Sequence, residues 1–549
     1  MTTSRVRRSL AMAATTAATG LLAACSSPAS ASAPGTAADA AAAGAPVTGG
    51  ELTYLEHQPY TTLYAPQAGF YPNGALVNNL TARLTWQDPA SLEIEPWIAT
   101  DWTVNADATE YTFDLRDGVT FSDGTPLDAA AVAKNFDTYG LGAKDRGLTV
   151  SEAVNNYASS QVVDADTVTF RFSAPAPGFL QATSTINSGL VSPATLDRKL
   201  EDFGAGNAKE IIGSGPFVVA SEELNQSIRL EARPDYDWAP PSFAHQGRAY
   251  LDAINIVVTP EDSVRIGSLL SGQADAARQV QAYDERQVTD AGYTVIGAPT
   301  RGVNNSLNLR SANPLLADLR VRQAITHAVN AQEVVDTLFT ANYPVGTSPL
   351  ASTAKGYVDE SAKLAFDPTR SAQLLDEAGW TPGADGIRVK DGQRLSLTIY
   401  VAPAQPRAKE TIELVSQQLA KVGVEGVVKV VDNATFNADA KDAIKAPIIQ
   451  SMVGRADNDV IKSQFHTKNR NQLAGSDPAL DALLEAVAST PDQAGRDAAS
   501  AAVQDYLVDN AYVVPLFEEP QVYGVAPNVH GFATESVARP AFYDVWKSA

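Results

Sequence analysis

A run of ionisable and polar side chains between residues 455 and 459 has the composition of a ligand-binding segment. An apolar pair at 448–449 begins a short strand, and Arg455, Asp457, Asn458 and Asp459 follow it. A carboxylate is a suitable acceptor for a buried ammonium, and the planar fork of arginine matches a carboxylate. Arg455 therefore either faces a ligand carboxylate or forms an ion pair with Asp457 on a loop that touches no ligand.

Aromatic residues near the start of the folded part form a second candidate set. Aromatic walls suit a pocket that accepts peptides of varied sequence, whereas plain core packing also explains each ring. The sequence leaves both interpretations open. The residues are Tyr54, Tyr60, Tyr64, Phe70, Tyr71 and Trp86.

Signals for metal binding and catalysis are weaker. The five histidines are scattered, and neither HxxH nor HExxH occurs. His466 follows the charged segment and is the one candidate metal ligand. Ser352 and Lys355 fit the SxxK motif of penicillin-binding proteins, but the partner motifs of those enzymes are absent. We therefore expect a protein that is not an enzyme and has no cofactor, with a hydrolase as a minor alternative.

The first 25 residues carry the features of an export signal. Three arginines within residues 5–8 precede an uncharged apolar stretch at 10–24, which ends in LLAAC. Residues 1–24 are predicted to be a signal peptide, because the apolar stretch is too short for a comfortable membrane span. Its end resembles the lipobox of bacterial lipoproteins, which implies that Cys25 is diacylated and begins the mature chain. Ordinary cleavage with an idle cysteine is the alternative.

Composition narrows the function further. The chain has 549 residues, which is too long for one hydrophobic core, and a net charge of −22. Such an acidic surface repels phosphate, so we expect no nucleic-acid partner, and it offers no basic patch for an anionic membrane. Residues 25–49 consist almost wholly of Ala, Ser, Gly, Thr and Pro after the cysteine. They are predicted to form a flexible tether.

Strand and helix patterns alternate from Glu51 onward, which predicts a mixed α/β fold. In EYTFDLRDGVTFSDG, apolar residues alternate on both sides of Asp117-Gly118. This pattern predicts a β-hairpin with strands at 111–115 and 119–121.

Helix boundaries are also indicated. Asp367 followed by Pro368 is typical of a helix start. The segment AVQDYLVDNAYVVPLF predicts a helix that runs into a short strand broken by Pro515.

Several stretches, in order, resemble the family-five extracellular solute-binding proteins of ABC importers, which include dipeptide, oligopeptide and nickel receptors. The most specific is EIEPWIATDWTVNADATEYTFDLRDGVTFSDGTPLDAAAVAKNF. The other stretches are GGELTY, SGPFVV, EARPDYDW, LDAINIVV, LLSGQADAA, DLRVRQAITHAVN, FDPTRSAQLLDEAGW, ADGIRVKDGQRLSLTIYV and NAYVVPLF.

The resemblance implies an architecture. It is a two-lobed, periplasmic-binding-protein-like fold with an extra subdomain on the first lobe. Lobe one is expected at 50–308 and 515–549, with the extra subdomain at about 90–210, and lobe two at 309–514. Two crossing strands between the lobes would act as a hinge for rigid-body closure.

The resemblance also implies site residues. Asp457 aligns with the aspartate that holds the α-ammonium of the peptide in peptide-binding members, and a shift of two residues would move this role to Asp459. His57 lies where family members approach the ligand. The chain departs from the family pattern, since Val460 stands where proline is common and Arg455 replaces an aromatic or small residue. The ligand class is therefore open.

Together these features predict a monomeric, exported receptor. We expect it to be lipid-anchored at the outer face of the cytoplasmic membrane and to capture peptides or peptide-like ligands between two closing lobes. It would deliver them to the transmembrane subunits of an ABC permease. A nickel or metal-chelate receptor of the same family is the first alternative, and an exported lipoprotein hydrolase is the second.

Overall fold

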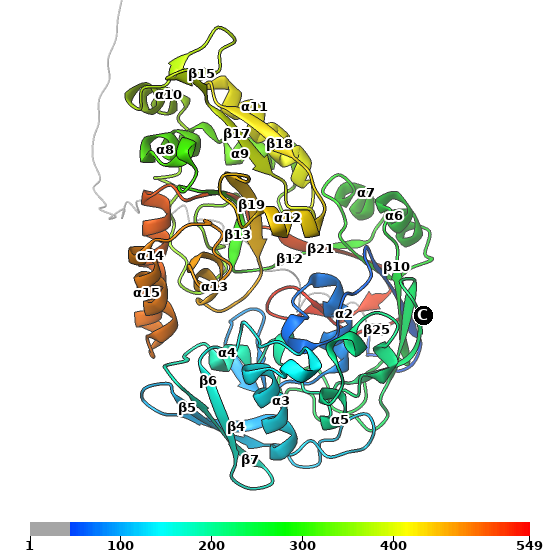
Figure 1. Cartoon of the computed structure of the whole chain (residues 1–549). Helices are drawn as coiled ribbons and strands as arrows, with labels where there is room; N and C mark the ends of the chain where they lie inside the picture. The colour runs from blue at the N-terminus through cyan, green and yellow to red at the C-terminus, as the bar shows by residue number, and fades with distance from the viewer. Residues whose placement is uncertain (1–43, 549) are drawn as a thin grey trace, which may run out of the picture. The chain divides into compact units, whose positions relative to one another are not determined.

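The structure, a computed structural model, describes residues 44–548 (Figure 1). The predicted signal peptide, Cys25 and most of the predicted tether lie outside the described residues. Residues 44–50 have no regular secondary structure, and the first strand begins at Glu51. Within the described range, every helix is too short or too polar to cross a membrane.

A mixed sheet of seven strands is built around the first strand of the described chain. Strand β1 runs parallel to its neighbours β10 and β11, and the remaining pairs are antiparallel. Strand β21 comes from the last thirty residues of the chain, and β1 is the first strand of the described chain. The beginning and the end of the fold therefore both belong to this sheet. In spatial order the strands are β12 (Thr294–Pro299), β21 (Pro520–Val525), β11 (Ala276–Arg278), β1 (Glu51–Glu56), β10 (Ala253–Val258), β9 (Ser227–Ala232) and β8 (Phe217–Glu223).

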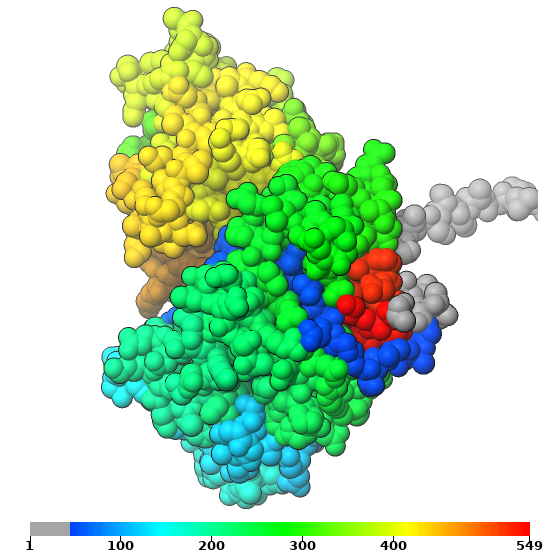
Figure 2. Space-filling view, turned by 90° about the vertical axis from the view of Figure 1, so that its right-hand side faces the viewer, coloured from blue at the N-terminus to red at the C-terminus, as the bar shows by residue number. Residues whose placement is uncertain are grey.

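The C-terminal segment lies against the beginning of β1. Figure 2 shows the red C-terminal residues beside the blue start of the fold, and Lys547 Nζ donates to the Glu51 carbonyl oxygen at 3.0 Å. Short strands and helices complete this part of the molecule. They are α2 (Tyr71–Leu80), β2 (Thr85–Gln87), β3 (Ile94–Pro96), α4 (Phe179–Ala182), α5 (Pro193–Leu196), α6 (Asp262–Leu270), α7 (Glu285–Asp290), β22 (Val529–His530), β23 (Ala533–Thr534), β24 (Pro540–Ala541) and β25 (Trp546–Lys547).

An antiparallel sheet of four strands falls within the predicted extra subdomain. Its order is β4 (Ala99–Val104), β5 (Glu110–Leu115), β7 (Thr167–Phe172) and β6 (Tyr157–Val162). Helix α3 (Ala129–Leu141) packs across it, and the side chain of Asp128 caps this helix by accepting from Ala131 N (Figure 1). The predicted hairpin is wrong, because β5 pairs with β4 and β7 and residues 119–121 form no strand.

A second mixed sheet has five strands. Their order is β18 (Glu425–Lys429), β17 (Ser396–Tyr400), β19 (Ile448–Val453), β13 (Val303–Leu309) and β20 (Val513–Phe517). Helices α9 and α11 pack against its edge strands β20 and β18. The helices of this part are α8 (Leu319–Ala328), α9 (Ala331–Leu338), α10 (Pro368–Glu377), α11 (Ala408–Lys421), α12 (Asn433–Asp439), α13 (Val460–Phe465), α14 (Pro478–Ser489) and α15 (Gln493–Asp509), with a small sheet of β14 (Thr381–Pro382), β15 (Arg388–Lys390) and β16 (Gln393–Arg394).

Two short crossing segments join the seven-stranded and five-stranded sheets. Residues 300–302 connect β12 to β13, and residues 518–519 connect β20 to β21. The segments touch, since Thr300 Oγ1 donates to the Glu519 carbonyl oxygen at 2.6 Å. Strands β13 and β20 both belong to the five-stranded sheet, so the chain changes sheet before 308 and after 515. The predicted lobe boundaries stay a prediction, and we place them at the crossing segments.

Candidate binding cavity

A cavity of about 760 Å³ is lined by loops from both large sheets and by Glu519 of one crossing segment. Residues directly after β1, β11, β17 and β19 contribute to its wall. Strand β1 is parallel to β11, and β17 is parallel to β19, so each pair ends at one edge of its sheet. Loops beyond the carboxyl ends of parallel strands are the usual place for ligand sites in α/β proteins. The volume is in the range of small-molecule pockets.

The charged lining of the cavity contains more guanidinium groups than carboxylates. The arginines are Arg278, Arg455, Arg470 and Arg539, and the acidic residues are Glu152 and Glu519. Arg455 is largely buried, whereas Arg470 and Glu152 are about half exposed. A ligand that carries a carboxylate therefore meets several fork-shaped donors.

Arg278 is held in a buried network at the end of β1. Its guanidinium makes a bidentate contact with Glu56, with Nε at 2.8 Å from Oε2 and Nη2 at 2.6 Å from Oε1. Burial alone would raise the pKa of Glu56, but Arg278 and His57 outweigh it and lower this pKa to about 2. Burial lowers the pKa of His57, against the opposing hydrogen bond with Glu56, and so favours its neutral imidazole. Since Glu56 already neutralises Arg278, this arginine offers hydrogen bonds more than net charge.

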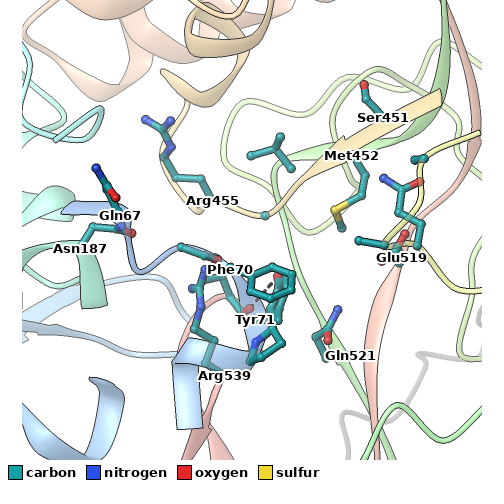
Figure 3. A pocket seen from close by; sticks show the side chains of 18 of the residues that line it. Gln67, Phe70, Tyr71, Asn187, Ser451, Met452, Arg455, Glu519, Gln521 and Arg539 are labelled. Atoms are coloured by element: carbon teal, nitrogen blue, oxygen red, sulfur yellow. Dashed lines mark hydrogen bonds between the residues drawn. The ribbon is translucent and has the colours of Figure 1, made fainter. Parts of the chain in front are cut away.

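Aromatic rings and amides form another part of the wall. The Tyr71 ring lies beneath Arg539, with its centroid 4.9 Å from the guanidinium carbon, which is a cation–π arrangement. Figure 3 shows Phe70, Tyr71 and Arg539 together, with the amides of Gln67 and Asn187 beside them. This wall offers flat apolar surface and hydrogen-bonding groups to a ligand.

Glu519 is the buried acidic residue of the wall. It is 7% exposed, and its Oε2 accepts from Asn305 Nδ2 at 3.0 Å. Burial raises its pKa to about 7, against the weaker opposing effects of Asn305 and Arg278. In the view of Figure 3 it lies on the opposite side of the cavity from Arg455.

The structure brings only part of the predicted site together. His57 and Arg455 line the cavity, whereas Tyr60, Asn458 and Asp459 are not among the residues of its wall. The Tyr60 hydroxyl donates to Glu222 at 2.8 Å. Ligand binding by His57 and Arg455 stays a prediction.

Asp457 also lies outside the wall of the cavity. Both of its carboxylate oxygens contact Arg496 of α15, with Nη1 at 3.1 Å from Oδ2, and both side chains are at most 8% exposed. Burial would raise the pKa of Asp457, but the Arg496 guanidinium outweighs it and lowers this pKa. Asp457 is therefore a neutralised charge, and its predicted role as an ammonium anchor stays untested.

The alternative in which Arg455 forms an ion pair with Asp457 is wrong. Arg455 Nη1 instead lies 3.2 Å from Asp459 Oδ1, four residues along the chain, and Asp459 also accepts from Asn155 at 3.2 Å. Asn458 donates to Asp497 of α15 at 2.9 Å. The polar side chains of this segment thus contact α15 and the extra subdomain, and both partners are distant in sequence.

His466 is buried and lies outside the cavity. Its Nε2 is 3.0 Å from Glu485, and its Nδ1 accepts from the Lys468 amide at 3.0 Å. Within residues 44–548 there is no group of three or more His, Cys, Asp or Glu side chains placed to hold a metal ion. Nothing in this geometry makes His466 available to a ligand in the cavity.

Glu519, Arg539 and Glu152 line the cavity but were not predicted from the sequence. A signal for the first was present, since two adjacent acidic residues, Glu518 and Glu519, directly follow an apolar strand where the chain was expected to return to lobe one. Arg539 and Glu152 carried no local signal, because they reach the cavity through loops whose positions depend on the whole fold.

The chain is similar in sequence to one protein family and to several known proteins. The family model described as "Bacterial extracellular solute-binding proteins, family 5 Middle" matches residues 93–470, more than half of the chain. Protein XP55 of Streptomyces lividans is 27% identical over 485 residues, covering 85% of this chain and 83% of that protein. The glutathione-binding protein GsiB of Escherichia coli K12 is 23% identical over 455 residues, covering 80% and 84%.

Solved structures establish the fold. NikA of Brucella suis, in complex with Fe(III)-EDTA, has a TM-score of 0.76 at 24% identity, covering 91% of this chain and 100% of that one. The oligopeptide-binding protein AppA of Bacillus subtilis, in complex with a nonapeptide, has a TM-score of 0.76 at 20% identity, covering 92% and 100%. The predicted two-lobed α/β fold is confirmed.

Proposed function

The chain belongs to the bacterial extracellular solute-binding proteins, family 5, and we propose that it is the receptor of an ABC importer for peptides or peptide-like ligands that carry a carboxylate. The observation that carries this proposal is the cavity of about 760 Å³ between the two large sheets, with four arginines in its wall. A buried carboxylate needs a charged donor, and arginine supplies two parallel hydrogen bonds.

The comparisons support the same ligand chemistry. GsiB is named for glutathione, AppA was solved with a nonapeptide and NikA with an iron–EDTA chelate. All three ligands carry carboxylates. An arginine-rich cavity suits this shared feature, while the remaining lining selects among the ligands.

Closure of the two lobes around the ligand is part of the proposal. Contacts between the two parts of the molecule support it, because Glu152 Oε2 lies 3.4 Å from Arg470 Nη2 and Asn155 donates to Asp459. Glu152 and Asn155 belong to the extra subdomain, whereas Arg470 and Asp459 follow the five-stranded sheet. Opening at the crossing segments would break these contacts, so they favour the closed arrangement.

Anchoring and delivery complete the proposal. We place the mature chain at the outer face of the cytoplasmic membrane, held by a lipid on Cys25 and a flexible tether. It would act as a monomer and pass its cargo to the transmembrane subunits of a permease, without chemical change to the ligand.

The test is to identify what the purified protein retains. Native mass spectrometry of freshly prepared protein is expected to detect a bound carboxylate-bearing ligand. In a thermal-shift screen, short peptides that bind should raise the melting temperature of the protein. Recovery of the ligand unchanged after incubation separates a receptor from the hydrolase alternative. Stabilisation by a metal–EDTA complex, with no response to any peptide, would favour the chelate alternative and overturn the peptide proposal.

A further inference from the structure

Glu519 has an unusual environment for a buried carboxylate. It belongs to the crossing segment between β20 and β21 and contributes to the cavity wall. Across residues 44–548, no nitrogen of an arginine, lysine or histidine side chain lies within 4.0 Å of its carboxylate oxygens. Other buried acids near the cavity, such as Glu56 and Asp457, each have an arginine partner.

The neighbours of Glu519 hold it in place but leave it a free acceptor. Within residues 44–548 its carboxylate accepts one hydrogen bond, from the side-chain amide of Asn305, which also donates to Gln405 at 2.8 Å and accepts from Gln450 at 2.9 Å. Asn305 is thereby fixed, and a single neutral donor satisfies little of a carboxylate's hydrogen-bonding capacity. A buried acid without a cation is costly, so its presence in a cavity wall calls for a partner that arrives from outside.

We infer that Glu519 is the subsite for a cationic group of the ligand, an ammonium or a guanidinium. The inference rests on the proposed function and deepens it. The ligand would be held at two ends, with a carboxylate toward Arg455 and Arg470 and a cation toward Glu519, all of which line the cavity. In the view of Figure 3, Arg455 and Glu519 lie on opposite sides of the cavity. Asp457 is a poorer partner for the cation, because Arg496 occupies both of its oxygens.

The electrostatics of the empty site support this assignment. Burial raises the pKa of Glu519 to about 7, so the empty protein readily holds a proton there. A cation at hydrogen-bonding distance would stabilise the ionised form and displace that proton. The site therefore exchanges a proton for a ligand cation, which selects ligands that carry one.

The experiment uses a peptic digest of casein as the probe, in three forms. One form is untreated. In the second, lysines are converted to homoarginine before acetylation, so that only the α-amine is blocked. In the third, all amines are acetylated. The wild-type protein is mixed with each digest and separated by gel filtration, and the retained peptides are identified by mass spectrometry.

The matched variants are Glu519→Gln and Glu518→Gln. Glu518 is the adjacent residue, is equally buried, accepts from the Ser352 amide at 2.9 Å and is not among the residues of the cavity wall. We expect wild-type protein and Glu518→Gln to retain peptides with a cationic group at least tenfold more than peptides without one. Glu519→Gln should lose this preference while its ligand-free melting temperature at pH 8 is maintained or raised. Loss of retention in the second digest assigns the subsite to the α-ammonium, and loss only in the third assigns it to a lysine side chain.

Three outcomes overturn the inference. Equal retention by wild-type protein of peptides with and without a cationic group, or an unchanged preference in Glu519→Gln, would overturn it and leave the peptide receptor standing. Retention of no peptide from any digest would overturn the peptide function and this inference together.

Discussion

Asp457 and Arg496 form a buried, two-point ion pair between the end of the β19 segment and helix α15. Arg496 Nη1 lies 3.1 Å from Asp457 Oδ2, Nη2 contacts Oδ1, and neither side chain exceeds 8% exposure. The pair fastens a loop beside the cavity to the helix behind it. This contact gives Asp457 a structural role that its sequence position did not reveal.

Asp457→Asn is expected to destabilise the protein. The substitution keeps the shape of the side chain but leaves the Arg496 guanidinium buried without a counter-charge. Removing one partner of a buried pair costs about 3–5 kcal/mol. The free energy of unfolding, measured by urea denaturation of the ligand-free protein, should fall by about this amount. Affinity for a retained peptide should change by about twofold or less.

The control for this change is Asp497→Asn on the same helix. Asp497 is partly exposed and accepts from Asn458 and Gln493, which are neutral. Its substitution should alter stability by less than about 1 kcal/mol. If Asp457→Asn weakened peptide binding by a hundredfold with stability unchanged, Asp457 would be the ligand anchor and the structural role assigned here would be wrong.

Gly302→Ala is predicted to disturb both stability and binding. Gly302 lies in a crossing segment with φ of +87°, and an added Cβ would come within 2.3 Å of the Val453 carbonyl oxygen and 2.8 Å of the Arg455 amide nitrogen. The left-handed backbone alone costs about 1–2 kcal/mol for a residue with a side chain. The clash adds to this cost and pushes away the segment that carries Arg455.

Gly292→Ala separates these two effects. Gly292 has φ of +85°, but nothing lies within 4 Å of its added Cβ. Thermal melting should show a smaller loss of stability for Gly292→Ala than for Gly302→Ala, and only the latter should weaken peptide retention. Equal losses in both variants would mean that the crossing segment adapts to the extra carbon without moving Arg455.

Local sequence signals predicted local structure well. Asp367 followed by Pro368 indicated a helix start, and α10 does begin at Pro368 with Asp367 accepting from the Arg370 amide at 2.8 Å. Such a signal needs only neighbouring residues, because a capping side chain bonds to a backbone group three positions away.

Contacts between distant segments could not be predicted in this way. The hairpin predicted at Asp117-Gly118 failed because β5 finds its partners in β4 and in β7, and β7 lies more than fifty residues later in the chain. The partner of Asp457 is 39 residues away on α15, so the sequence offered only the nearby Arg455. Arg539 and Glu152 reach the cavity through long-range packing, which no local pattern encodes.

Cys25→Ala should release the protein from the membrane or leave its signal uncleaved. The prediction rests on the LLAAC sequence and on Cys25 being the sole cysteine of the chain. One acyl chain alone gives marginal binding, whereas two or three anchor a protein stably. Fractionation of cells grown with labelled palmitate measures both effects. Equal labelling of wild type and variant would contradict lipidation at this residue.

The ionisation of Glu519 should make stability depend on pH. Its pKa is raised from an unfolded value of 4.5 to about 7, chiefly by burial, and the titratable groups near it are Arg278, Tyr71 and Tyr343. The folded protein therefore binds a proton more tightly than the unfolded chain. This linkage favours the folded state fully below about pH 4.5, and the advantage is lost as the pH rises to about 7.

Glu519→Gln removes this dependence, since the amide cannot ionise. We compare the free energy of unfolding of the variant with that of the wild type at each pH. Between pH 4.5 and pH 8 the variant should gain about 3 kcal/mol relative to the wild type, which follows from the size of the pKa change. Urea denaturation of the ligand-free proteins at several pH values measures it, with Glu518→Gln as the neighbouring control.

A bound cation should lower the pKa of Glu519, so peptide binding at pH 6 should release a proton from wild-type protein. Calorimetry in buffers of different ionisation enthalpy detects this release, and its persistence in Glu519→Gln would assign the proton to another group.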